Sequence, residues 1–209
     1  MGKYFGTDGF RGEANVTLTV EDAYKVGRFL GWYYGQKTKA DRCRVVIGKD
    51  TRRSSYMFEY SLVSGLTASG ADVYLLHVTT TPSVSYVVRT EEFDCGIMIS
   101  ANHNPYYDNG IKVINGRGEK LEEETIEKIE SYLDGEMGEI PFAKRDAIGR
   151  TVDYAAGRNR YIGYLISIAT RSFKNMKVAL DCANGSAWHI APRIFEALGA
   201  QVFTINTNP

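Results

Sequence analysis

Short apolar runs alternate with helix-like stretches along this chain, and that alternation constrains the fold more than any other feature of the sequence. Three of these runs have the length of a strand: "RVVIG" at 44–48, "ADVYLLHV" at 71–78 and "CGIMIS" at 95–100. Continuous apolar runs of this length are typical of strands covered on both faces. Helical periodicity is found before and between them, at 20–35, 54–69 and 82–89. We therefore predict an α/β fold, an α/β/α sandwich with a mixed and mainly parallel sheet.

The later part of the chain indicates a second, smaller unit. "GIKVIN" at 110–115 follows the turn signal "DNG", so we expect this strand to run antiparallel to its neighbour. An acidic amphipathic helix is expected at 121–133. Residues 135–149 lack periodicity, which is typical of a linker, and a single β-α-β unit follows. We predict a first domain at 1–150 and an incomplete second domain of the same kind at 151–209.

The balance of charge narrows the classes of partner. Lys and Arg together number 25, as do Asp and Glu, so the formal net charge is zero. Binding to nucleic acids or to anionic membranes needs an excess of positive charge, so neither is expected. No apolar run approaches the ~20 residues of a transmembrane helix, and the sequence does not open with a signal-peptide pattern. We expect a cytoplasmic protein whose three cysteines, Cys43, Cys95 and Cys182, are small core residues.

The motif "FGTDGFRG" at 5–12 combines three glycines with an arginine. Glycines let the backbone turn tightly and approach a ligand closely. Arg11 offers a planar fork that is suited to a phosphate group. The alternative is an ordinary N-terminal loop whose arginine pairs with a surface carboxylate.

The motif "GKDTRRSS" at 48–55 lies where a strand runs into a helix. Ligands of open α/β sheets bind at the carboxyl ends of strands, and helix N-termini favour anions. Lys49, Arg52 and Arg53 add positive charge there. The alternative is a capped helix start, with Ser54 as N-cap and solvated basic residues. The spacing of a Walker A loop is absent, as is GxGxxG, which disfavours a general nucleotide-binding protein.

The segment "ISANHNPYYDNGIK" at 99–112 is the third polar motif, and it also follows an apolar strand. Histidine suits proton transfer near neutral pH, and lysine suits charge stabilisation of an anion, so His103 and Lys112 are candidates for these roles. The alternative for His103 is a structural histidine in an Asn-Pro turn. We interpret the other two histidines, His77 and His189, as structural.

Taken together, the three motifs resemble the α-D-phosphohexomutase superfamily, in particular its branch that acts on glucosamine phosphates. "LDCANGSA" at 180–187 resembles the start of the second domain of that family. The resemblance implies a phosphohexose mutase, an isomerase that interconverts glucosamine 6-phosphate and glucosamine 1-phosphate through a phosphoserine and a sugar bisphosphate. It also implies Mg²⁺ as cofactor, glucose or glucosamine 1,6-bisphosphate as activator, a phosphosugar as substrate and a cytoplasmic location.

The resemblance also assigns site residues. It places the phosphoserine position on Asn102, and it implies that Arg11 grips the phosphate, that Lys112 stabilises charge and that His103 supports the loop. Lys49 would add positive potential. The remaining phosphate- or substrate-binding residues that it implies are Thr7, Ser100, Asn104 and Asn109.

Two departures from the family pattern lead us to expect that this chain is inactive as given. The amide of Asn102 has no hydroxyl and cannot form the phosphoester. The "DGDGDR"-type loop whose aspartates bind Mg²⁺ in the family has no match in these residues. The alternative function is therefore a non-catalytic pseudoenzyme or an isolated phosphate-binding fragment. We also expect self-association, or a homodimer, through the open sheet edge of the incomplete second domain.

Overall fold

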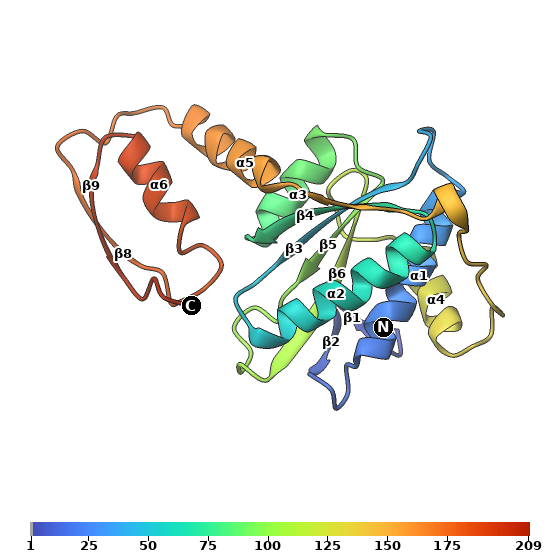
Figure 1. Cartoon of the computed structure of the whole chain (residues 1–209). Helices are drawn as coiled ribbons and strands as arrows, with labels where there is room; N and C mark the ends of the chain where they lie inside the picture. The colour runs from blue at the N-terminus through green and yellow to red at the C-terminus, as the bar shows by residue number, and fades with distance from the viewer. Residues whose placement is uncertain (1) are drawn as a thin grey trace.

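The computed structural model describes residues 2–209. Its larger part is a seven-stranded sheet in the order β1–β2–β6–β5–β3–β4–β7 between layers of helices (Figure 1). The strands of this sheet are β1 (Phe5–Gly6), β2 (Gly9–Glu13), β3 (Arg44–Lys49), β4 (Asp72–Val78), β5 (Cys95–Ile99), β6 (Asp108–Asn115) and β7 (Thr151–Asp153). The helices that accompany it are α1 (Val20–Gly35), α2 (Arg53–Ala68), α3 (Thr81–Thr90), α4 (Glu123–Leu133), α5 (Ala155–Ser167) and a 3-10 turn, η1 (Arg145–Ala147).

The predicted mixed and mainly parallel sheet is confirmed. Strand β3 runs parallel to both β4 and β5, and β7 runs parallel to β4. Strand β6 is antiparallel to β5, as the "DNG" signal predicted, and β2 is antiparallel to β6. Because β2 therefore points the same way as β5, five of the seven strands of this sheet run in one direction, with β1 and β6 opposed.

The two faces of the sheet carry separate apolar clusters. Val45 and Ile47 of β3 lie in the larger cluster, with residues of α1, α2 and α4. Val46, between them, lies in the smaller cluster with Val84 and Val87 of α3. Alternate side chains of a strand point to opposite faces, and both faces are covered here. This double burial explains why the strand reads as a continuous apolar run.

Helices α1 and α2 begin with different capping arrangements. Thr19 and Asp22 form the capping box at the start of α1, with each side chain bonded to the backbone of the other residue. Helix α2 begins at Arg53, so Ser54 lies inside its first turn, and the expectation that Ser54 is the N-cap is wrong. Asp50 takes part of that role, because its Oδ1 accepts from the backbone N–H of Arg52 at 3.1 Å.

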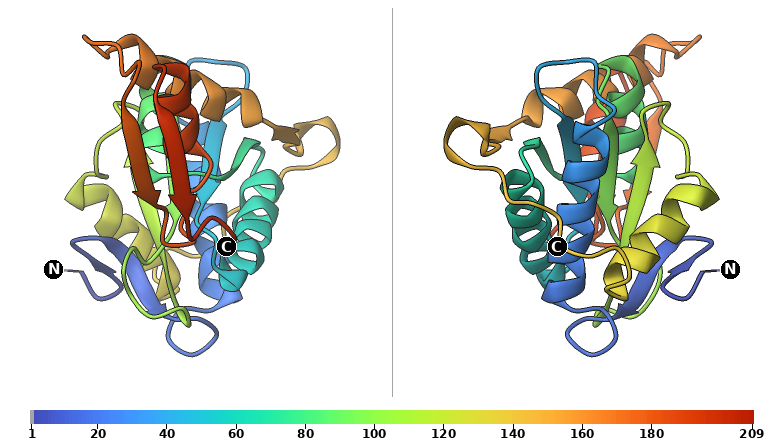
Figure 2. Two further views of the ribbon diagram at one scale, coloured as in Figure 1. Left: turned by 90° about the vertical axis from the view of Figure 1, so that its left-hand side faces the viewer. Right: turned by 90° about the vertical axis from the view of Figure 1, so that its right-hand side faces the viewer.

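A two-stranded parallel sheet, β8 (Lys177–Asp181) and β9 (Gln201–Ile205), forms the predicted incomplete second unit together with α6 (Ile190–Ala197). Figure 2 (left) shows these two strands side by side in front of the first unit, and Figure 1 shows them apart from the first sheet. Helix α5 joins the units and packs against α3, β4 and α6. Phe203 and Ile205 of β9 are 51% and 62% exposed, so this small sheet leaves apolar surface uncovered.

Three further observations complete the fold. Strand β7 extends the first sheet beyond residue 150, next to β4, and the division of domains at that residue stays a prediction. The three cysteines are free and buried. Among residues 2–209 no helix has the length and apolar character needed to cross a membrane.

Candidate active site

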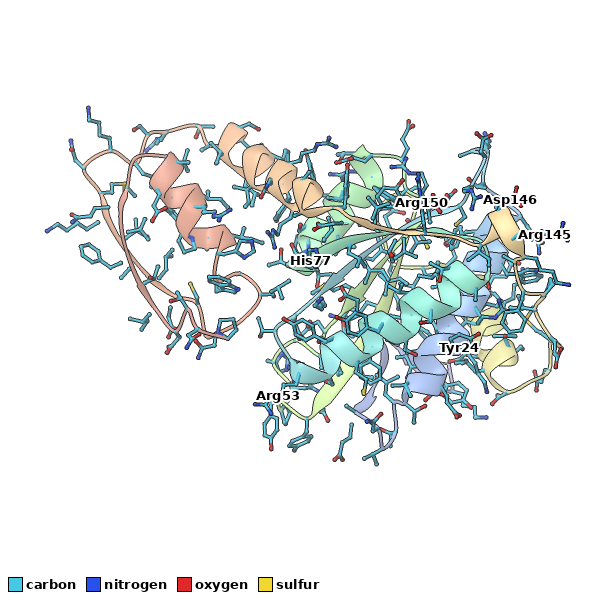
Figure 3. All side chains as sticks on the ribbon, in the orientation of Figure 1. Tyr24, Arg53, His77, Arg145, Asp146 and Arg150 are labelled. Atoms are coloured by element: carbon cyan, nitrogen blue, oxygen red, sulfur yellow. The ribbon has the colours of Figure 1, made fainter. Side chains whose placement is uncertain are left out.

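A large cleft of about 1070 Å³ opens where β3 and β5 end. The loop that follows β3 lines it through Asp50 and Arg52, and the loop that follows β5 lines it through Ser100, Asn102 and Asn104. The second unit closes the far side with the segment 183–186. Figure 3 shows Arg53 at the end of α2 that lies at this edge. The carboxyl ends of parallel strands are where ligands bind in open α/β folds, and two of the three motifs meet here.

Lys112 of β6 reaches back to the tip of the loop that precedes its strand. Its Nζ donates to Asn102 Oδ1 at 2.6 Å. The side chain is half-buried, and burial, followed by the positive charge of Arg11, lowers the pKa of Lys112. The ammonium group is thus a partly desolvated cation that touches residue 102.

Arg11 of β2 lies on the same face of the sheet as Lys112. Phe10 pairs with Ile111 across β2 and β6, and both belong to the core on the α1 and α2 face, so Arg11 and Lys112 point to the opposite face. Arg11 Nη2 lies 3.2 Å from Asp8 Oδ2, an ionic contact without hydrogen-bond alignment. Its Nε and Nη2 are buried and have no hydrogen-bond partner among the described residues. Such donors favour an added acceptor.

Asn102 occupies the tip of the loop in a left-handed conformation, with φ +54°. Asparagine adopts this region more readily than most residues. Its backbone N–H donates to Ser100 Oγ at 3.1 Å, and its side chain is exposed towards the cleft. The loop therefore presents the side chain of residue 102 to the cleft in a fixed orientation.

Arg52 holds this loop in place, a role that the sequence did not reveal. Its Nη2 donates to the carbonyls of Asn102 at 2.9 Å and Asn104 at 2.8 Å. Its Nη1 donates to the carbonyls of Pro105 and Asp108, and its Nε donates to Asp50 Oδ2 at 2.9 Å. All of these partners belong to the protein itself, whereas the sequence predicts only that Arg52 adds positive charge.

The other polar residues of the loop also bind within it. Asn104 Nδ2 donates to Asp108 Oδ2 at 3.0 Å. Asn109 is fully buried, and its Nδ2 donates to the hydroxyls of Ser54 and Ser55 at the start of α2. Ser100 and Asn104 line the cleft, whereas Asn109 fastens the loop to the helix. His103 is exposed and forms no hydrogen bond with the described residues.

Lys49 lies away from Lys112, Arg11 and Asn102. It pairs with Ile99 across β3 and β5, on the face that carries α1 and α2. There its Nζ forms an ion pair with Glu59 of α2, and each of the two side chains is only 3% exposed. The expectation that Lys49 adds positive potential at the site is wrong in position, because its charge is buried and compensated.

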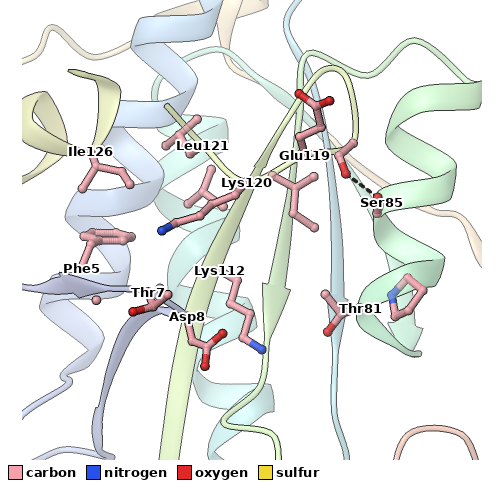
Figure 4. Close-up of a pocket in the computed structure, with 16 residues that line it drawn as sticks. Phe5, Thr7, Asp8, Thr81, Ser85, Lys112, Glu119, Lys120, Leu121 and Ile126 are labelled. Atoms are coloured by element: carbon pink, nitrogen blue, oxygen red, sulfur yellow. Dashed lines mark hydrogen bonds between the residues drawn. The ribbon is translucent and has the colours of Figure 1, made fainter. Parts of the chain in front are cut away.

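A second cavity, of about 460 Å³, adjoins the cleft on the α3 face of the sheet. Thr7 and Asp8 of the β1–β2 turn line it, together with Lys112, Lys120 and Thr81. Figure 4 shows Lys112 lying between Asp8 and Thr81. Thr81 lines both cavities. Thr7 and Lys112 therefore line the same cavity.

The donors at this edge fit an anion rather than a metal ion. The described part of the chain contains no group of three or more His, Cys, Asp or Glu side chains arranged to hold a metal. Mg²⁺ prefers carboxylate and other oxygen ligands in octahedral geometry. Asn102, which lines the cleft, offers an amide, and Lys112 and Arg11 offer an ammonium and a guanidinium group on the α3 face beside it; these groups suit phosphate.

Comparisons with known proteins agree with this reading. The family description "Phosphoglucomutase/phosphomannomutase, alpha/beta/alpha domain I" matches residues 2–138. Proteins named phosphoglucosamine mutase from Lachnospira eligens and Lachnoclostridium phytofermentans are 71% and 73% identical to all 209 residues. The chain spans 46% of each of these relatives, just under half of their length.

Solved structures share the fold. A phosphoglucomutase/phosphomannomutase family protein from Burkholderia thailandensis superposes on 98% of this chain with a TM-score of 0.80. A putative phosphomannomutase from Thermus thermophilus gives a TM-score of 0.79 over the same share. Each is 24% identical in sequence, and the match covers 44% and 46% of those chains.

Proposed function

The chain belongs to the phosphoglucomutase/phosphomannomutase family, and from this membership we propose that its cleft binds a phosphosugar for phosphoryl transfer. In the complete protein the reaction would interconvert glucosamine 6-phosphate and glucosamine 1-phosphate. Relatives more than 70% identical to the whole chain carry the name phosphoglucosamine mutase, which supports this substrate. A cytoplasmic location is proposed on the same resemblance. Self-association, or a homodimer, is proposed because the second unit leaves apolar surface uncovered at its open sheet edge.

The contact between Lys112 Nζ and Asn102 Oδ1 carries the proposal. A phosphate group on the side chain of residue 102 would meet this ammonium group directly. Arg11, with two unpartnered guanidinium nitrogens on the same face of the sheet, supplies a second cation. Phosphoryl transfer depends mainly on positioning and on stabilising the charge of the phosphoryl oxygens. Lys112 and Arg11 would supply that stabilisation.

The transfer step needs a hydroxyl oxygen at position 102. That oxygen would attack the phosphorus of a sugar bisphosphate, the bond from phosphorus to the sugar oxygen would break, and the sugar oxygen would take up the hydroxyl proton. His103, one residue on and exposed, is the proposed proton carrier and loop support. Asn102 has an amide at this place, so we propose that the chain as given binds phosphosugars without accepting a phosphoryl group.

The proposed cofactor and activator rest on the family membership of the chain. We propose Mg²⁺ for the complete protein, but residues 2–209 offer no cluster of carboxylates for it. A bisphosphorylated glucose or glucosamine is proposed as the activator, because it is the phosphoryl donor that the step above requires.

A second candidate function is a non-catalytic phosphosugar-binding protein, and Asn102 is the observation that favours it. The two candidates share the cleft and differ only in whether residue 102 becomes phosphorylated. The cation pair would retain phosphate affinity in either case.

A chimaera tests the proposal. This chain replaces the matching 209 residues of the Lachnospira eligens relative, in one version with Asn102 and in another with Asn102→Ser. After incubation with glucose 1,6-bisphosphate and Mg²⁺, we expect one phosphate on residue 102 of the serine version only, together with conversion of glucosamine 6-phosphate. Equal turnover by both versions would rule out residue 102 as the carrier. A folded serine version that takes up no phosphate would contradict the site assignment.

A further inference from the structure

A third cavity, of about 580 Å³, lies at the junction between the two units and is not part of the site described above. Thr51 and Tyr56 line it from the first unit, Arg158 from α5, and His189 and Arg193 from the start of α6 and its first turn. Figure 1 shows α6 on the side of its two-stranded sheet that faces the first unit. Thr51 also lines the active-site cleft, so the two spaces are neighbours.

The cavity holds two arginines that form no ion pair with a carboxylate of the described residues, although the charge of Asp153 acts on Arg158 from a longer distance. Arg158 and Arg193 form no ion pair with any described residue, although Arg158 Nη1 donates to the Val78 carbonyl at 3.2 Å. Arg158 Nε is buried and unpartnered. Burial, followed by the charge of Arg193, lowers the pKa of Arg158. Glu196 lines the same cavity without pairing with either arginine, and the local charge stays positive.

His189 adds two further unsatisfied polar atoms. Both ring nitrogens are buried, and neither has a hydrogen-bond partner among the described residues. Burial, followed by the charges of Arg158 and Arg193, lowers the pKa of His189 to about 4, so the ring is neutral at pH 7. Buried polar groups are almost always hydrogen-bonded, and an unmade bond is costly. An acceptor placed between the imidazole and the arginines would receive hydrogen bonds from Arg158 Nε, from Arg193 and from the one protonated ring nitrogen of His189.

We propose that this junction cavity binds a small oxyanion, the phosphate group of a phosphorylated metabolite, independently of the active-site cleft. Guanidinium groups match phosphate oxygens with two parallel hydrogen bonds. Hydroxyl donors are present as well, on Tyr56, Thr204 and Thr207. The volume exceeds that of phosphate alone, which leaves room for the rest of a small metabolite.

The bound anion would connect the two units. Among the described residues, one hydrogen bond joins the loop after β3 to the second unit. In it, Thr51 Oγ1 donates to the Asn184 carbonyl at 3.0 Å. A phosphate held by α5, α6 and the Tyr56 hydroxyl would add bonds across the same junction. We therefore expect binding to slow the amide exchange of residues 190–197.

The test is a titration of the ¹⁵N-labelled chain with inorganic phosphate at constant ionic strength, in a background that carries Arg11→Gln and Lys112→Gln. These two changes remove the two cations that we assign to the phosphate of the active site, and because Arg52 and Arg53 still line the cleft, binding at the junction is read from the α6 amides and from its dependence on Arg193. We expect saturable shifts of the α6 amides and an upward shift of the His189 pKa. Arg193→Gln should weaken binding about tenfold or more. Arg193 is exposed, so this change spares the core.

Arg171→Gln is the matched control, because Arg171 is an exposed arginine of the same unit that does not line the cavity. It should leave the phosphate affinity unchanged. The absence of saturable shifts in α6, or equal shifts with and without Arg193, would overturn the proposal. Acetate that binds as tightly as phosphate would overturn the assignment of phosphate.

Discussion

Lys112 Nζ and Asn102 Oδ1 lie 2.6 Å apart, so the second residue of the strand's buried "IKVIN" run contacts the tip of the loop that precedes it. The contact depends on the antiparallel turn from β5 into β6, in which Met98 pairs with Lys112. Because that pairing fixes which face Lys112 occupies, the cation meets residue 102 from the α3 side of the sheet.

Replacing Lys112 by Met should weaken phosphate binding at the cleft about tenfold. A lysine binds an anion only while it is protonated. The pKa of Lys112 is lowered, so Lys112 loses its proton at a lower pH than an exposed lysine does. The phosphate affinity should therefore begin to fall at a lower pH. Calorimetric titration with phosphate between pH 7 and pH 10 measures the affinity. All proteins in this comparison carry Arg193→Gln, which weakens phosphate binding at the junction cavity. Lys174→Met, at an exposed site of the second unit, is the control, and the idea fails if both variants bind phosphate equally well.

Arg52→Lys should destabilise the protein by about 2 kcal/mol, because lysine cannot reproduce the fork that binds four carbonyls and the buried carboxylate of Asp50. Amide exchange of residues 101–105 should become faster. Urea unfolding and hydrogen exchange measure the two effects. Arg53→Lys, one residue on and exposed, should change neither. Unaltered protection of the loop in Arg52→Lys would show that the clamp is dispensable.

Gly9→Ala should cost about 1–3 kcal/mol and displace Arg11. Gly9 has φ +91°, and a Cβ atom there would lie 2.4 Å from the Ile111 carbonyl oxygen. Gly135→Ala is the control, because Gly135 has φ +81° but no atom within 4 Å of an added Cβ. The difference between the two variants in the free energy of unfolding isolates the steric clash. Similar values for both would mean that the hairpin can move away from β6 freely.

Lys49→Met should destabilise the protein by about 3–5 kcal/mol, since it leaves the buried carboxylate of Glu59 without its partner. The double variant Lys49→Met with Glu59→Leu should recover most of the loss. Phosphate affinity of the double variant should equal that of the parent protein. Thermal unfolding measures the stability, and calorimetric titration measures the phosphate affinity. A large loss of phosphate affinity in the folded double variant would show that Lys49 contributes to the anion site.

Because of His189, the free energy of unfolding should decrease as the pH falls from 6.5 towards 4. Its pKa is about 4 in the folded chain, against an ordinary value of 6.5. In this window the unfolded chain binds the proton and the folded chain does not, so the free energy of unfolding decreases. The effect should be about 1 kcal/mol between pH 7 and pH 5 after screening by solvent. His189→Gln, measured in phosphate-free buffer, should lack this part of the pH dependence. Parallel pH profiles for the two proteins would contradict it.

Several features of the fold could be predicted from local pattern alone. The apolar runs at 44–48 and 95–100 are strands because each must be covered on both faces, and the "DNG" turn reverses the next strand. Thr19 and Asp22 mark a helix start because the capping bonds join residues only three apart. The motif ending at Lys112 could be placed at a sheet edge because it directly follows a buried strand. Each of these signals is contained in a few consecutive residues of sequence.

What the tertiary structure decided is which of the basic residues face the cleft. Lys49 and Lys112 both belong to strands beside β5, but Lys49 pairs with Ile99 and Lys112 with Met98, so they emerge on opposite faces of the sheet. Lys49 therefore meets Glu59 of α2, while Lys112 meets Asn102. Arg52 is bound by backbone carbonyls about fifty residues away. Carbonyl groups are identical in every residue, so the sequence carries no sign of such a partner, and only strand pairing and helix packing determine it.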